Sequence, residues 1–300
     1  MKAKMRLVMN VKSLLSLLAL ACLVAACEKP FVELDPEAPR DDDANLVVRV
    51  VGFETLDFGS PSATKTTVPV TDLCSRLNFV VYSGETKVSC VAQKEGDAGF
   101  GTVALSLPEG TYRIAVVGHS SEGSATVTTL DKISFKNNRV TDTFSYYTEL
   151  EVTDEAQTLD VELRRVVAMF RMALTEPLPE AVHQLKFYYT GGSSTLSAVT
   201  GYGSVNSKQT VVLDVDDGQT QFEVYTIPHA ETGKLKMTIT ALDVSGSELH
   251  QRVFEEVPVQ RNKITRYTGN FYEGTSAQNG GLEMQMHASP DWDGEEEHTF

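Results

Sequence analysis

The sequence predicts an all-β protein composed of two tandem β-sandwiches. Short segments rich in β-branched and aromatic residues recur along the chain, and clusters of turn residues separate them. Short strands at this spacing are typical of β-sandwiches, and no amphipathic helical stretch competes with them. The roughly 270 residues that follow an export signal suit two domains of roughly 100 to 150 residues each.

The first sandwich is predicted over residues 45–157. A turn at Ser83-Gly84-Glu85 is expected to join two of its strands into a hairpin. The strands expected in this half are 46–51, 77–82, 87–92, 102–107, 111–117, 125–128 and 142–150. Asp154, Glu155 and Gln157 then interrupt the pattern and indicate a boundary between the two domains.

The second sandwich is predicted over residues 158–274, and a tail over residues 275–300 follows it. Residues 166–174 are apolar enough for a buried strand, with a short helix as the alternative. The other strands expected here are 159–163, 184–189, 209–215, 221–227, 235–242, 249–254 and 263–272. The glycine-rich stretches 191–194 and 201–203 lack the ending of a phosphate loop, so we interpret them as a loop that crosses between strands.

The first 26 residues, 1–26, form a predicted lipoprotein signal peptide. Basic residues up to Lys12 precede an apolar run that is too short for a comfortable membrane span. The ending Val24-Ala25-Ala26-Cys27 resembles the bacterial lipobox, in which the cysteine thiol takes a diacylglycerol thioether and becomes the first residue. Cys27 is therefore the expected lipidation site that attaches the protein to a membrane, and a soluble secreted protein with a chance cysteine is the alternative.

Residues 27–44 form a predicted linker. Three prolines and the acidic run Asp41-Asp42-Asp43 leave few large apolar side chains to bury. Acidic residues soon after Cys27 also resemble the surface-export signals of Bacteroidetes lipoproteins, and a solvated spacer is the alternative. We expect a protein that is lipid-anchored in the outer membrane and exposed at the cell surface.

The charge of the chain argues against nucleic acid as a partner. The chain has 26 basic and 41 acidic residues and a net charge of −15, and phosphate binding needs basic clusters. The charge also keeps an exported protein soluble.

Cys74 and Cys90 are a candidate disulfide, because the expected compartment is oxidising. The predicted hairpin, however, places Cys90 opposite residues near Asn78 rather than opposite Cys74. Buried free thiols are the alternative.

No catalytic or metal-binding group of residues emerges from the sequence. The six histidines are scattered and none forms the helical pair that binds zinc, so we interpret each as structural. The acidic groups at 214–217 and 291–297 do not match a calcium-loop spacing, and we interpret them as a turn and a solvated tail. We expect that the protein is not an enzyme and that it binds no cofactor and no metal.

Several structural motifs, spread over most of the chain after the signal, resemble one known family. They are the stretches 73–77, 99–101, 108–113, 163–171, 187–193, 257–265 and 269–271. These stretches are similar to the FimB-like family of Bacteroidales fimbrial subunits and anchors, whose lipoprotein-derived pili are sometimes called type V. The resemblance implies two tandem transthyretin-like β-sandwiches, export as a lipoprotein, and a role in anchoring or building fimbriae with other fimbrial subunits.

The resemblance also implies a mode of assembly. In shaft subunits of the family, a protease cuts after a basic residue, the first strand leaves, and a neighbour's terminal strand fills the groove by β-augmentation. Anchors of the family keep the first strand. Arg40 and Arg49 are the candidate cut sites here, with an uncut strand as the alternative. The alternating segment that contains Leu282, Met284 and Met286 is a candidate donor strand, and an edge strand of its own domain is the alternative.

We predict a non-enzymatic fimbrial subunit, namely an anchor or a related accessory component, with a host or bacterial surface ligand as a further candidate partner. The first alternative is a polymerising shaft or tip subunit, and the second is a surface glycan-binding lipoprotein. A hydrolase is a third, although no pair of carboxylates stands out. The tyrosines that would serve a glycan site are Tyr146, Tyr147, Tyr188, Tyr189 and Tyr202.

Overall fold

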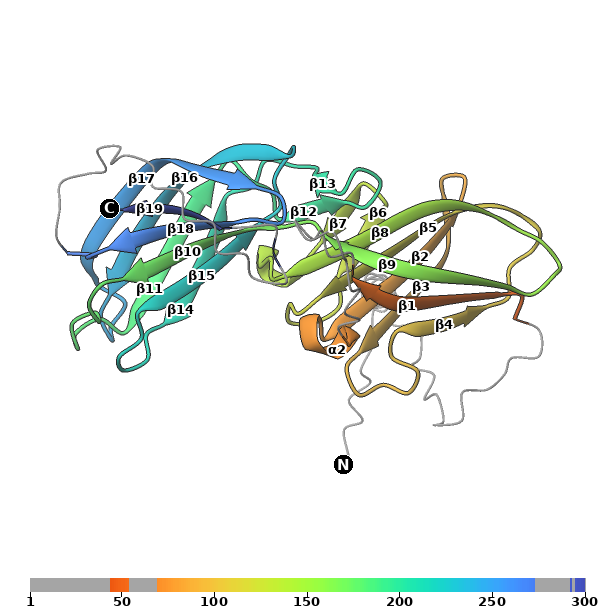
Figure 1. The fold of residues 1–300 in the computed structure, drawn as a ribbon, viewed down its shortest axis with the longest axis horizontal. Coiled ribbons are helices and arrows are strands. Elements are labelled where there is room, and N and C mark those ends of the chain that lie inside the picture. Colours follow the sequence, from red (N-terminus) through yellow and green to blue (C-terminus); the bar gives the residue numbers. More distant parts are fainter. Residues whose placement is uncertain (1–43, 54–68, 273–291, 293–294, 300) are drawn as a thin grey trace, which may run out of the picture. The chain divides into compact units, whose positions relative to one another are not determined.

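The computed structural model describes residues 44–53, 69–272, 292 and 295–299. These residues belong to one compact unit that spans residues 40–300. Apart from the four-residue helix α2 (Val70–Leu73) and a 3-10 turn at Lys136–Asn138, their regular structure consists of β-strands (Figure 1). The predicted all-β fold is therefore confirmed.

Seven strands of the first half form one sheet in the order β3-β2-β5-β8-β9-β1-β4 (Figure 1). Strands β8 and β9 pair at only two positions, Phe144 with Arg165 and Ser145 with Arg164. Side chains from both ends of the sheet, including Leu46 of β1 and Phe79 of β2, enter one buried cluster. The sheet therefore folds over into a sandwich. Its strands are β1 (Leu46–Phe53), β2 (Arg76–Ser83), β3 (Thr86–Lys94), β4 (Thr102–Leu105), β5 (Gly110–His119), β8 (Thr143–Val152) and β9 (Gln157–Arg165).

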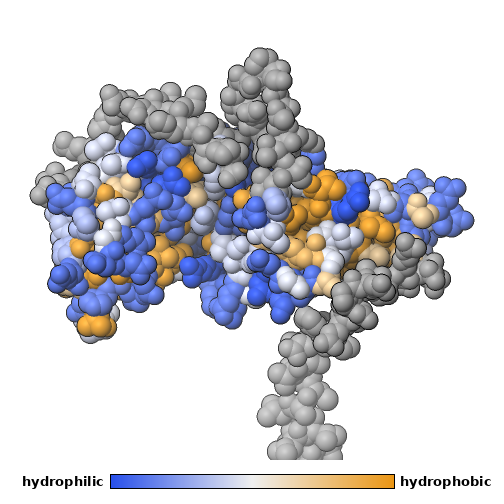
Figure 2. Space-filling view, turned by 60° about the horizontal axis from the view of Figure 1, so that its bottom comes forward, coloured by the Kyte–Doolittle hydropathy of each residue, from blue (hydrophilic) through white to orange (hydrophobic). Residues whose placement is uncertain are grey.

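The core of this sandwich reaches the surface in places. Leu73, Phe100, Leu105 and Leu159 pack against the buried cluster but are only partly buried. Figure 2 shows an apolar patch on the surface of the first sandwich. Among the described residues, some apolar side chains of this core are therefore partly exposed at the surface.

Strand β9 belongs to the first sheet. The predicted boundary at residues 157–158 assigned this strand to the second sandwich, and that assignment is wrong. β9 pairs with β1 in parallel, from Gln157 opposite Leu46 to Leu163 opposite Phe53. A parallel pair joins segments that are far apart in the sequence, so a local break in the pattern did not mark the end of the sheet.

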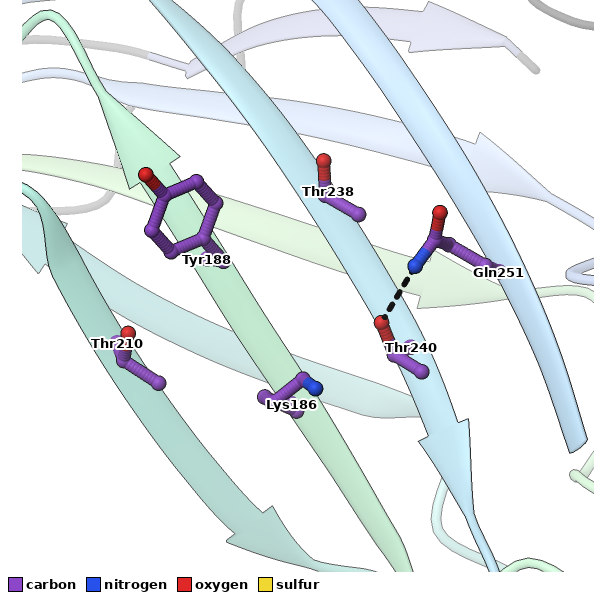
Figure 3. A pocket seen from close by; sticks show the side chains of 6 residues that line it. All are labelled: Lys186, Tyr188, Thr210, Thr238, Thr240 and Gln251. Atoms are coloured by element: carbon purple, nitrogen blue, oxygen red, sulfur yellow. Dashed lines mark hydrogen bonds between the residues drawn. The ribbon is translucent and has the colours of Figure 1, made fainter. Parts of the chain in front are cut away.

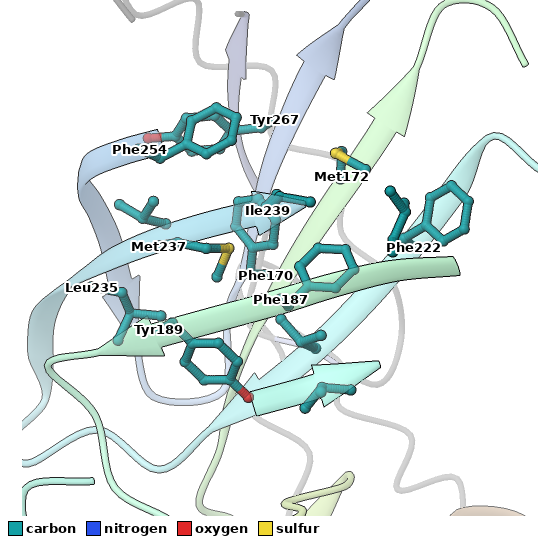
Figure 4. Close-up of a cluster of buried hydrophobic side chains, with 14 of the residues drawn as sticks. Phe170, Met172, Phe187, Tyr189, Phe222, Leu235, Met237, Ile239, Phe254 and Tyr267 are labelled. Atoms are coloured by element: carbon teal, nitrogen blue, oxygen red, sulfur yellow. The ribbon is translucent and has the colours of Figure 1, made fainter. Parts of the chain in front are cut away.

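Two four-stranded sheets make up the second sandwich, in the orders β15-β10-β18-β19 and β14-β11-β16-β17. Side chains from both sheets pack around Phe170, which is 1% exposed and lies beside Phe187, Phe254 and Tyr267 (Figure 4). Phe170 lies in a strand, which settles the choice between strand and helix for residues 166–174. The strands are β10 (Ala168–Leu174), β11 (Gln184–Thr190), β14 (Gln209–Asp214), β15 (Gln221–Thr226), β16 (Thr232–Leu242), β17 (Glu248–Gln260), β18 (Ile264–Gly269) and β19 (Glu295–Thr299).

A smaller sheet combines strands from both halves of the chain. It has the order β13-β12-β7-β6, and it buries Ile133 and Leu196 against Val80 of the first sheet. Its strands are β6 (Thr126–Thr129), β7 (Lys132–Ser134), β12 (Thr195–Ser197) and β13 (Tyr202–Gly203). The glycine-rich loop does cross between strands here. A Cβ atom at Gly192 would lie 2.0 Å from Oγ1 of Thr226, so this crossing requires glycine.

The acidic tail contains a strand, β19, which pairs in parallel with β18. Oε1 of Glu295 lies 3.3 Å from Nη1 of Arg171 and 3.8 Å from Nη1 of Arg266. Glu297 accepts a hydrogen bond of 2.8 Å from the hydroxyl of Thr268. The interpretation of residues 295–297 as a solvated tail is therefore wrong, because basic and polar groups on neighbouring strands pair with the acidic run.

Candidate functional site

Five of the residues singled out in the sequence lie outside the described residues. They are Cys27, Arg40, Leu282, Met284 and Met286. The lipidation site, one candidate cleavage site and the donor strand therefore stay predictions. In the part of the chain that the structure describes, no helix is long and apolar enough to span a membrane.

Arg49, the other candidate cleavage site, lies in the middle of β1 and has strands on both sides. It is opposite Thr102 of β4 on one side and opposite Asp160 of β9 on the other. Its Nε and Nη2 atoms donate hydrogen bonds of 3.0 Å to the two carboxylate oxygens of Asp160. Half of each side chain is exposed, so this ion pair lies at the surface while the backbone of β1 lies inside the sheet.

Cys74 and Cys90 are both free thiols, so the candidate disulfide is not formed. Cys74 is buried in the core of the first sandwich, and burial raises the pKa of its thiol to about 12. Cys90 is exposed on β3, opposite Val80 of β2. The hairpin of β2 and β3 therefore keeps the two cysteines apart. This agrees with the prediction that Cys90 lies opposite residues near Asn78 rather than opposite Cys74.

His119 belongs to a buried polar network. Its ring is fully buried, Nδ1 accepts a hydrogen bond of 3.1 Å from the backbone N–H of Ser121, and Nε2 lies 3.3 Å from Oδ1 of Asn78. Burial, with a smaller contribution from the positive charge of Arg76, lowers the pKa of His119 to about 4. Among the described residues, no group of three or more His, Cys, Asp or Glu is arranged to hold a metal ion.

The buried imidazole of His119 predicts a pH-dependent loss of stability. Between pH 6.5 and pH 4 the unfolded chain binds a proton on His119 that the folded chain does not, so the free energy of unfolding falls as the pH falls. The loss attributable to this residue reaches about 3 kcal/mol at pH 4. Urea unfolding of the wild type and of His119→Gln at both ends of this range measures it. We expect the difference in stability between the two proteins to shrink toward pH 4, and an unchanged difference contradicts this assignment.

Arg165 and Trp292 form a contact that the sequence did not suggest. The Arg165 side chain is 4% exposed, and its Nε and Nη2 atoms donate to the carboxylate of Asp142 at 2.7 and 2.8 Å. Its Nη1 donates to Oδ1 of Asn262 at 3.1 Å. The guanidinium lies 4.8 Å from the ring centroid of Phe144 and 4.0 Å from that of Trp292. One arginine of β9 thus joins strand β8, the loop before β18 and the C-terminal segment.

The five tyrosines considered for a glycan site lie in different environments. Tyr189 is fully buried, and its hydroxyl donates a hydrogen bond of 2.8 Å to the backbone carbonyl of Tyr225. The ring of Tyr202 lies under the guanidinium of Arg261. Tyr146 and Tyr147 are partly buried against the two hydrophobic clusters of the first sheet. Only Tyr188 of the five is exposed, at 38%.

Tyr188 lies in a shallow hollow of about 280 Å³ on the outer face of the sheet β14-β11-β16-β17 (Figure 3). Thr210 of β14 and Thr238 of β16 lie directly opposite it on the two neighbouring strands. Two residues along β11, Lys186 lies between Val212 and Thr240 in the same way. The lining residues are Lys186, Tyr188, Thr210, Thr238, Thr240 and Gln251. Regular strand pairing therefore holds one aromatic ring and several hydrogen-bonding groups on one face of the sheet.

The hollow carries one positive charge and no carboxylate in its lining. Lys186 forms no ion pair among the described residues, and its cross-strand neighbours Val212 and Thr240 are uncharged. Oγ1 of Thr240 accepts a hydrogen bond of 3.2 Å from Nε2 of Gln251. The arrangement can stack against a flat apolar ring face, donate and accept hydrogen bonds, and pair with one anionic group. Tyr188 is a candidate from the sequence but its neighbours are not, although the alternation of polar and apolar residues along these strands places them on one face.

Comparison with known proteins gives one family and a set of distant structural similarities. The model of DUF6562, described as a family of unknown function, matches residues 75–299, and no curated protein matches the chain. The matching model is not that of the FimB-like family, so that resemblance stays unconfirmed.

Three solved structures illustrate the structural similarity. A candidate adhesin from Bacteroides ovatus is 14% identical with a TM-score of 0.45, over 71% of this chain and 82% of that chain. A candidate cell adhesion protein from Bacteroides uniformis is 12% identical with a TM-score of 0.42, over 77% and 93% of the two chains. The fimbrial anchor protein Mfa2 from Porphyromonas gingivalis is 12% identical with a TM-score of 0.39, over 69% and 80%.

Proposed function

We propose that this chain, which belongs to the DUF6562 family of unknown function, is a lipid-anchored protein of the bacterial outer membrane that serves as a fimbrial anchor or a related adhesion component. The proposal combines the predicted lipid on Cys27 with the way the first strand is held. Other fimbrial subunits are the proposed partners, and the protein contributes attachment rather than catalysis.

The pairing of β1 is the observation that carries the proposal. In the family that the sequence resembles, shaft subunits lose their first strand after cleavage at a basic residue, whereas anchors keep it. Here the strand lies between β9 and β4, and it places Leu46, Val48 and Val50 in the core with exposed fractions of 0%, 1% and 7%. Burial of each such side chain is worth about 1.5–3 kcal/mol. Loss of β1 would uncover these side chains, remove the strand that pairs with β4, and leave β9 with only its two-position pairing to β8.

The position of Arg49 supports retention of the strand. A protease binds its substrate as an extended segment, but the backbone around Arg49 already pairs with Thr102 and Asp160 on its two sides. Cleavage would require β1 to leave the sheet first. At Arg49 this geometry favours an uncut strand, as in an anchor, over a polymerising subunit that is cut there.

Replacement of the predicted lipid-bearing cysteine tests the attachment. A Cys27→Ala variant is expected to move from the membrane fraction to the soluble fraction, because stable membrane binding depends on the acyl chains. Fractionation of cells followed by immunoblotting measures the distribution. Cys90→Ser is the matched control, since it removes an exposed free thiol and should leave the protein in the membrane fraction. Equal membrane retention of the wild type and Cys27→Ala would rule out the lipid anchor.

A further inference from the structure

We propose that the hollow around Tyr188 binds a terminal sugar that carries a carboxylate. The inference is independent of the anchor role, because it rests only on side chains of β11, β14, β16 and β17. It assigns to the second sandwich a ligand-binding function in addition to attachment.

The aromatic ring provides the first element of recognition. Tyr188 is 38% exposed on a strand whose backbone is paired on both sides, so its position is held by the sheet. Thr210 and Thr238 flank it across the two neighbouring strands, and all three side chains line the same hollow (Figure 3). An exposed ring between hydroxyl groups suits a pyranose, which has an apolar face and an equatorial belt of hydroxyls.

The ammonium of Lys186, which forms no ion pair with the residues that the structure describes, provides the second element. Lys186 precedes Tyr188 by two residues on the same face of β11, so the two side chains start about 7 Å apart. This spacing accommodates one pyranose ring stacked on the tyrosine with its carboxylate directed at the lysine. A charge-assisted hydrogen bond from the ammonium would then fix the orientation of the sugar. The lining contains no carboxylate that competes for Lys186.

The surrounding charges indicate a single terminal sugar rather than an anionic polymer. On these strands Asp214 accepts a hydrogen bond of 2.9 Å from the neutral amide of Gln184 and so keeps its negative charge, whereas Glu255 lies 2.8 Å from Nζ of Lys236. The chain as a whole has a net charge of −15. A polymer with a carboxylate on every unit would be repelled by this surface, whereas one terminal carboxylate can lie at Lys186, the one charged residue in the lining of the hollow.

Titration of three methyl glycosides into the full mature chain tests the inference. The probes are the α-methyl glycoside of N-acetylneuraminic acid, methyl β-glucuronide and, as the neutral control, methyl β-glucoside. At least one acidic probe is expected to bind about tenfold more tightly than the neutral one, since a hydrogen bond to a charged group contributes this much. The stronger of the two acidic probes distinguishes a sialic acid from a uronic acid as the natural source.

Three variants separate the site from the rest of the surface. Lys186→Met should reduce the affinity for the acidic probe to that for the neutral glucoside, and Tyr188→Ala should weaken binding of every probe. Lys236→Met is the matched control, because this lysine lies on the adjacent strand but is paired with Glu255. The Lys236→Met variant should bind each probe with the affinity of the wild type. All three side chains are outside the core, and thermal melts establish that each variant is folded. Absence of binding by both acidic probes, or binding that Lys186→Met leaves unchanged, overturns the proposal.

Discussion

Replacement of Arg165 with methionine is expected to lower the free energy of unfolding by about 3–5 kcal/mol, the cost of removing one partner from a buried ion pair. The substitution removes two donors, at 2.7 and 2.8 Å, from the carboxylate of Asp142, which is 21% exposed. It also removes the cation over the rings of Phe144 and Trp292. Equilibrium unfolding in urea, followed by tryptophan fluorescence, measures the effect, and Trp292 is the only tryptophan of the chain.

Arg49→Met is the matched control for this prediction. Arg49 also forms a paired set of hydrogen bonds with an aspartate, but the two side chains are 53% and 50% exposed. Exposed pairs contribute about 0–1 kcal/mol, so this variant should remain close to the wild type. Similar losses of unfolding free energy for Arg49→Met and Arg165→Met would contradict the conclusion that the buried ion pair of Arg165 stabilises the fold.

Phe170→Ala is expected to destabilise the protein by about 3–5 kcal/mol, because it removes a large side chain from a closed core and leaves a cavity. Phe170 is 1% exposed, and its ring centroid lies 6.5, 6.3 and 5.5 Å from those of Phe187, Phe254 and Tyr267 (Figure 4). Thermal and urea unfolding both report the loss. The cavity cannot collapse easily, since the surrounding rings come from strands of both sheets.

The control for Phe170→Ala is Val244→Ala in the hairpin between β16 and β17. Val244 is 80% exposed, and substitutions of this kind usually change stability by less than about 0.5 kcal/mol. A cost for Phe170→Ala that is no larger than the cost for Val244→Ala would show that the two sheets do not share the core described.

Much of the fold could be predicted because its longer strands carry their signal locally. The β-branched segment 46–51 and the apolar segment 111–117 both lie inside observed strands, β1 and β5. The turn at Gly84 placed Cys90 near Asn78, and the observed register puts Cys90 opposite Val80, two residues away. Regular alternation and turn chemistry were sufficient in these cases.

The strands that sequence reasoning missed depend on distant partners. β7 and β12 have three residues each, and they pair through Ser134 with Thr195 and Ile133 with Leu196, from opposite halves of the chain. Such short segments carry no periodicity of their own. β19 is highly acidic, and its strand conformation becomes understandable only beside Arg171 and Arg266. In β19, ion pairs with distant strands therefore outweigh the low strand propensity of the acidic residues.

The proposed binding site also combines features that the sequence predicts locally with features that depend on tertiary packing. Tyr188 was named from the sequence as one of five candidates, because an exposed aromatic is a recognisable element of a sugar site. The sequence did not rank the five, since burial of Tyr189 and the contact of Tyr202 with Arg261 depend on tertiary packing. Thr238 and Thr240 lie beside Tyr188 and Lys186 only because β16 pairs with β11, about fifty residues earlier in the sequence, which no local pattern indicates.

The mass of the N-terminal peptide from protein isolated at the cell surface tests the central claim most directly. We expect a single species that begins at an acylated Cys27 and continues uncut through Arg40 and Arg49 into β1. This result is the one required of an anchor that keeps its first strand. A mature protein that begins after Arg40 or Arg49, and so lacks the lipid, would contradict the account and identify a polymerising subunit instead.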